Sequence, residues 1–110
     1  MREAPSHIVF FGDGEKRFSL TLELIAELER LSGRGIGGLC RSLFAGDFHH
    51  AEVLQTIRLA LIGGGTDPEE AAALVATYAA PRPVMEPYAL AVAILETVMF
   101  GAAKKEPSDA

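Results

Sequence analysis

Residues 58–71 of this chain read Arg58-Leu59-Ala60-Leu61-Ile62-Gly63-Gly64-Gly65-Thr66-Asp67-Pro68-Glu69-Glu70-Ala71. Three glycines followed by a hydroxyl residue resemble a phosphate-binding loop. A Walker-type loop also needs a preceding strand and a Lys-Ser/Thr pair that meets phosphate and Mg²⁺. Here an amphipathic helical pattern precedes the glycines, no lysine follows them, and Asp67, Glu69 and Glu70 would repel an anion. The stretch therefore predicts one helix ending and another beginning, with a nucleotide site as the alternative.

Both flanking segments have helical patterns. The preceding helix is expected from about His49 to Ile62, capped by Asp47, with its apolar side chains inward. The following helix should begin with Asp67 as N-cap and Pro68 at the first helical position, and Glu70 is placed to complete a capping box. It should end near Ala80, because the prolines of the next three residues, Pro81-Arg82-Pro83, interrupt a helix.

The remaining segments complete a mainly α fold. Residues 8–20 predict a β-hairpin, since a β-prone run and an alternating run flank the turn signal Gly12-Asp13-Gly14. Helical patterns cover residues 21–32, about 36–44, and about 87–101. We therefore expect an N-terminal β-hairpin followed by about five short helices in a compact bundle. Residues 1–103 should form this single domain, and residues 104–110 read as a disordered polar tail.

The composition excludes several functional classes. Of 110 residues, 49% are hydrophobic but only 7% are aromatic, and small apolar residues of this kind favour close-packed helices. The net charge of −5 argues against binding nucleic acid, which requires clustered Lys and Arg. The apolar runs fit neither a signal peptide nor a membrane span, so a cytoplasmic protein without membrane partners is expected.

Side chains that could perform chemistry have simpler structural interpretations. His49 and His50 are adjacent, so on a helix they point ~100° apart and cannot easily share one metal ion. Cys40 falls on the inward face of its helix, which indicates a buried structural thiol. The acidic residues Glu23, Glu27 and Glu29 form a solvated face. No catalytic residue, cofactor or metal site is predicted, and the role of the His pair stays open.

The last helix has more apolar surface than one core-facing stripe needs. Its large apolar residues spread over an arc of roughly 200°, about twice the usual width. Either the helix is central and wrapped by the others, or half of its apolar surface meets another protein. For the second alternative, the predicted partner-binding residues are Tyr88, Val92, Leu95 and Met99.

Most of the chain, roughly residues 8–101, resembles the small tail protein of gene transfer agents, which are phage-like particles of alphaproteobacteria. The resemblance is carried by helix patterns and glycine stops rather than by a catalytic motif. It rests on Phe18-Ser19-Leu20 with residues 28–39, on residues 53–57 with Ala60-Leu61-Ile62-Gly63-Gly64-Gly65, on Ala71 and Leu74-Val75, and on Ala91, Ile94-Leu95 and Phe100-Gly101.

That family has been labelled both a tail tube protein and a tail assembly chaperone. The resemblance implies a non-enzymatic role in building a phage-like tail, with tape-measure or other tail proteins as partners and with homo-oligomers possible. A chaperone of this kind is small, acidic and helical, and it coats the apolar tape-measure protein, whereas a tube protein should be mainly β. The chaperone is therefore the first hypothesis, a tube or tail-completion subunit the second, and a small nucleotide- or metal-binding enzyme the third.

Overall fold

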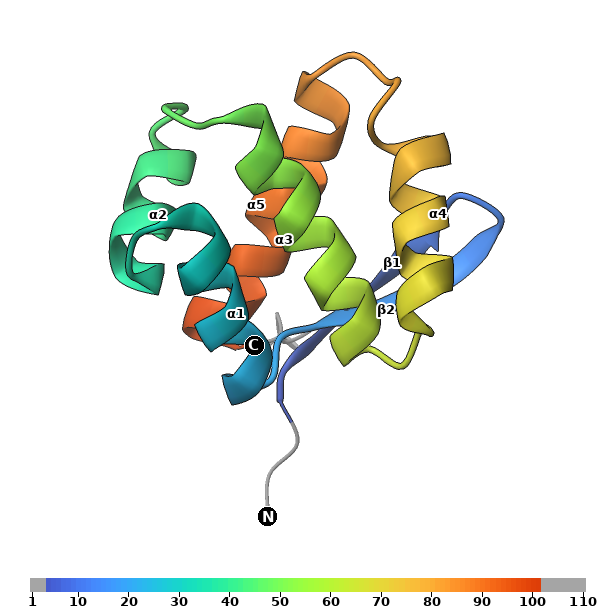
Figure 1. Cartoon of the computed structure of the whole chain (residues 1–110), viewed down its shortest axis with the longest axis horizontal. Coiled ribbons are helices and arrows are strands. Elements are labelled where there is room, and N and C mark those ends of the chain that lie inside the picture. Colours follow the sequence, from blue (N-terminus) through green and yellow to red (C-terminus); the bar gives the residue numbers. More distant parts are fainter. Residues whose placement is uncertain (1–3, 102–110) are drawn as a thin grey trace, which may run out of the picture.

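The structure is a computed structural model that describes residues 4–101. It confirms the mainly α fold with an N-terminal hairpin (Figure 1). The elements are β1 (Ser6–Phe11), β2 (Gly14–Ser19), α1 (Leu22–Ser32), α2 (Ile36–Phe44), α3 (His50–Gly63), α4 (Pro68–Tyr78) and α5 (Met85–Phe100). The tail predicted at residues 104–110 lies outside the described residues. Within residues 4–101, no helix is long and apolar enough to cross a membrane.

The hairpin is antiparallel and pairs Phe11 with Gly14 across a two-residue turn. Gly12 occupies the first turn position with φ 70°, a conformation that glycine adopts without strain and that fits a type II′ turn. The side chains of Phe11 and Phe18 lie on the inner face, with ring centroids 5.8 Å apart in an edge-to-face arrangement. This inner face packs on the helices, which stabilise a sheet too small to be stable alone.

Helices α3 and α5 form the centre of the molecule. Helix α3 contacts β2, α1, α4 and α5, while α5 also contacts α2 and both strands. Figure 1 shows α3 crossing in front of α5, with α1 and α2 on one side and α4 on the other. The side chains buried on these two helices include Val53, Ile57, Leu61, Ala91, Ile94 and Leu95. Of the two alternatives for the last helix, the central position is therefore the one that the fold shows.

Two predicted helix starts differ in detail from the structure. Asp47 was expected to cap α3, but the N-cap is His49, whose backbone N–H donates to Glu52 Oε1 at 3.1 Å. Asp47 instead belongs to the preceding turn, where its N–H donates to the carbonyl oxygen of Ser42. Helix α5 begins at Met85, so Pro87 lies inside its first turn, where a missing N–H costs no helical hydrogen bond.

The glycine run Gly63-Gly64-Gly65 joins α3 to α4 and also packs against the hairpin. A Cβ on Gly63 would lie 1.8 Å from the carbonyl oxygen of Ser19, and a Cβ on Gly64 would lie 1.8 Å from that of Arg17. Only glycine therefore lets the end of α3 approach β2 so closely. The predicted Asp67 cap is present, since its side chain accepts from the N–H of Glu69 at 3.2 Å. The run is a helix junction and a contact to the strand.

Candidate functional site

The most exposed large apolar side chains lie where α1 begins and α5 ends. Leu22 is 85% exposed and Phe100 is 78% exposed, and Met99 beside it is 42% exposed. A hollow of about 380 Å³ at this place is lined without any charged residue, by Ala4, Pro5, Leu20, Thr21, Leu22, Ile25 and Val98. We call Leu22, Ile25, Val98, Met99 and Phe100 the α1–α5 surface.

The start of α1 and the end of α5 position the side chains of this surface. Helix α1 starts at Leu22 because Thr21 caps it, its hydroxyl oxygen accepting from the N–H of Leu24 at 3.3 Å. Helix α5 stops at Phe100, since Gly101 has φ 89° and leaves the helical conformation. Leu22 and Phe100 thus occupy terminal turns, where no further turn of their own helix covers them. The lining of the hollow carries no charge, and the large apolar side chains beside it are exposed, which suits contact with another apolar surface.

The four predicted partner-binding residues are not all on this surface. Leu95 is fully buried in the core, and Val92 is half-buried. Tyr88 packs inward, where its ring stacks on Phe48 with centroids 4.5 Å apart and its hydroxyl donates to the carbonyl oxygen of Leu43 at 2.6 Å. Met99 alone of the four belongs to the α1–α5 surface. The helical arc is wide because α5 contacts helices and strands on several sides, so its width is mostly core.

The structure places the other candidate residues apart from one another. His49 and His50 lie exposed at the start of α3, and among residues 4–101 no three His, Cys, Asp or Glu side chains are grouped to hold a metal ion. Burial raises the pKa of the Cys40 thiol to about 11, so the thiol stays protonated, as the buried structural interpretation predicts. The glycine run lies at the C-terminus of α3, whose carbonyl end repels anions.

The predicted acidic face of α1 has one member with a structural task. Glu27 forms an exposed ion pair with Arg30 at 2.6 Å, as a solvated face would. Glu29, however, accepts a hydrogen bond from the backbone N–H of Ile36 at 2.8 Å. Because Gly35 offers no side-chain cap, Glu29 supplies the acceptor that the start of α2 needs.

A partly buried ion pair ties the α1–α2 link to α3. The Arg34 guanidinium donates to both carboxylate oxygens of Glu52, with the shortest contacts at 2.9 Å, and Glu52 is buried. Burial by itself would raise the pKa of Glu52. The hydrogen bonds from Arg34 and from the backbone N–H of His49 outweigh this effect and hold the pKa below its usual range. The group is thus a structural clamp.

A comparison with known protein families identifies the family. Residues 4–101 match the family described as "Phage tail tube protein, GTA-gp10". The chain belongs to this tail protein family. No curated protein and no solved structure matches the chain. The resemblance to gene transfer agent tail proteins is therefore confirmed, and so is a role among tail proteins.

The sequence pattern of this tail protein did not predict that Leu22 and Phe100 would be exposed on the α1–α5 surface. Leu22 precedes the apolar stripe of its helix, which begins at Leu24, and Phe100 stands next to the glycine that ends α5. A signal was nevertheless present. Large apolar residues in a terminal turn lack a following or preceding turn to cover them, so each is a candidate for exposure.

Proposed function

We propose that this tail family member is a tail assembly chaperone that acts in the cytoplasm. Its partner would be the tape-measure protein of a gene transfer agent or prophage, which it would cover until tube subunits polymerise. The observation that carries this proposal is the exposed apolar α1–α5 surface, with its hollow lined by uncharged residues, on an acidic, mainly helical domain. We assign no reaction to the chain.

The size of the α1–α5 surface favours reversible contacts. Fully burying one large apolar side chain contributes about 1.5–3 kcal/mol, so covering Leu22 and Phe100 gives modest affinity per copy. Modest affinity suits a protein that must be displaced when the tube forms. A long tape-measure protein could bind many copies, and their contributions would together keep it in solution.

A structural tube or tail-completion subunit is the alternative, and the printed family description favours it. A tube subunit would be expected to be mainly β and to close into a ring. Among the described residues the only sheet has two strands, and most of the chain is helical. This difference in architecture supports the chaperone.

Co-expression with the tape-measure protein tests the proposal. The soluble fraction of the tape-measure protein should rise several-fold with the native chain and fall back with Leu22→Ser combined with Phe100→Ser. Val84→Ser combined with Met85→Ser is the matched control, because these exposed apolar residues lie at the opposite end of α5. An equal soluble fraction with and without the native chain would refute the chaperone.

A further inference from the structure

Among the described residues, a helix covers the outer edge of β2, whereas no element pairs with the outer edge of β1. A two-residue turn makes Phe11 and Gly14 a hydrogen-bonded pair, and alternation along an antiparallel ladder then makes Ile8–Arg17 a non-hydrogen-bonded pair. The backbone groups of such pairs point outward from both strands. The carbonyl oxygens of Arg17 and Ser19 agree with this register, because they face Gly64 and Gly63. Helix α3 thus covers the outer edge of β2.

Within residues 4–101, the outer edge of β1 is open. Its outward N–H and C=O groups belong to Ser6, Ile8 and Phe10, and no further strand of the described residues pairs with them. Ile8 is 56% exposed and Phe10 is 70% exposed, and none of the six residues of β1 carries an acidic or a Lys or Arg side chain. Charges are the usual means by which proteins protect such an edge from pairing with another chain.

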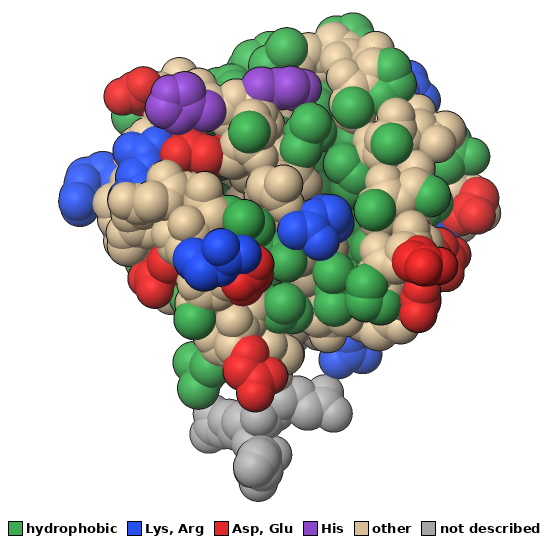
Figure 2. Space-filling view, in the orientation of Figure 1, with side chains coloured by type: hydrophobic (Ala, Val, Ile, Leu, Met, Phe, Trp, Pro, Cys, Tyr) green, Lys and Arg blue, Asp and Glu red, His purple; other side chains and the backbone are tan. Residues whose placement is uncertain are grey.

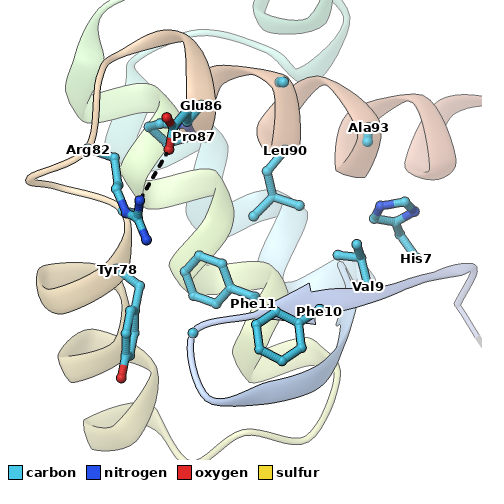
Figure 3. A pocket seen from close by; sticks show the side chains of 13 residues that line it. His7, Val9, Phe10, Phe11, Tyr78, Arg82, Glu86, Pro87, Leu90 and Ala93 are labelled. Atoms are coloured by element: carbon cyan, nitrogen blue, oxygen red, sulfur yellow. Dashed lines mark ion pairs between the residues drawn. The ribbon is translucent and has the colours of Figure 1, made fainter.

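A hollow of about 480 Å³ runs between β1 and α5. In Figure 3, His7 and Val9 point from the strand toward Ala93 and Leu90 on α5. The lining is mostly apolar, and Arg82 and Glu86, its two oppositely charged residues, pair with each other at 3.7 Å. Alternate side chains of an added strand would enter this hollow, while its backbone would meet the open edge.

Carboxylates near the hairpin turn would favour a positively charged residue in a strand added to the edge of β1. Glu15 lies opposite Phe10 in the register, and Glu69 and Glu70 belong to the first turn of α4. In the part of the chain that the structure describes, no ion-pair partner is found for Glu15 or Glu69, while the charge of Glu70 acts on Lys16, which pairs with Asp13. Figure 2 shows acidic side chains gathered over the start of α4. A Lys or Arg in the occupant, placed near the turn, would complement them.

We propose that the open edge of β1 binds an extended apolar segment of a partner polypeptide, which joins the hairpin as a third strand and places a basic residue near the turn. A second copy of this chain fits less well. Antiparallel pairing of two β1 strands would put both helical layers on one face of the sheet, so the second α5 would compete for the same hollow. This surface is separate from the α1–α5 surface and does not depend on the tape-measure partner.

A synthetic peptide tests strand addition directly. The probe is acetyl-Lys-Val-Thr-Val-Ala-Val-Ser-amide, whose N-terminal Lys would reach the turn when it lies antiparallel to β1. In NMR titrations of the full chain, the amides of Ile8 and Phe10 should shift and exchange more slowly with solvent. Alternate residues of the peptide form two phases, one with N–H groups that face β1 and one with N–H groups that point away from it. N-methylation of the phase that faces β1 should weaken binding by about tenfold or more, whereas N-methylation of the other phase should leave it almost unchanged.

Variants and controls make the outcome decisive. Ala89→Arg places a large side chain in the hollow from an exposed helical position and should weaken binding about tenfold, whereas Ala73→Arg on the outside of α4 should not. Replacing the peptide's Lys by Glu should also weaken binding. The proposal is overturned if the peptide fails to bind at about 1 mM, if both N-methyl phases bind equally, or if the peptide only dissociates a dimer paired through β1.

Discussion

At the scale of single residues, the junction between α3 and α4 requires glycine at positions 63 and 64, where a side chain would collide with β2. Gly63→Ala would place a Cβ against the carbonyl oxygen of Ser19, so either α3 or β2 would have to move. We expect a loss of about 2 kcal/mol or more in the free energy of unfolding, as for overpacked cores. Chemical denaturation measures it. Gly37→Ala is the control, since its Cβ meets nothing within 4 Å, and it should leave stability unchanged or higher.

A second prediction at this scale concerns the partly buried clamp between Arg34 and Glu52. The pKa of Glu52 is lowered in the folded state, so its contribution to stability is present above the ordinary pKa of Glu and is lost as pH falls through the lowered value. Glu52→Gln should therefore cost about 2 kcal/mol at pH 7 and much less near pH 3. Denaturation at both pH values measures the difference. A cost that is equal at both would contradict the clamp.

At the scale of elements, α5 is a central helix that packs on the core through its middle and is exposed at both ends. Leu95→Ala should lower the free energy of unfolding by about 2–4 kcal/mol, because Leu95 is fully buried and the cavity cannot close completely. Met99→Ala, at an exposed position, should cost less than about 1 kcal/mol. Thermal or chemical denaturation compares the two variants. A larger loss for Met99→Ala would mean that α5 does not sit as described.

The elements also show how far the sequence alone could go. Helix periodicity, the Asp67-Pro68 start and the turn at Gly12 were enough to predict the hairpin and all five helices, because each signal is local. Approaches between distant elements were not predictable. Nothing local reveals that Gly63 and Gly64 face the carbonyl oxygens of β2, or that Glu29 caps α2. For the same reason, the sequence could not show which apolar residues of α5 face the core and which reach the surface.

At the scale of the whole molecule, the fold combines a tightly packed centre with two open surfaces. The α1–α5 surface is apolar and carries the proposed chaperone contact, while the edge of β1 offers backbone hydrogen bonds. The chain's membership of a tail protein family makes other tail proteins the expected partners. A chaperone should leave its partner when the tail is complete, whereas a tube subunit should remain.

Quantitative mass spectrometry of purified particles therefore tests the central claim most directly. The measurement compares the copy number of this chain with that of the tape-measure protein, in mature particles and in the lysate from which they were purified. We predict that the chain is abundant in the lysate and essentially absent from the particles. Many copies per tape-measure protein in the purified particles would contradict the chaperone and identify the chain as a structural subunit of the tail.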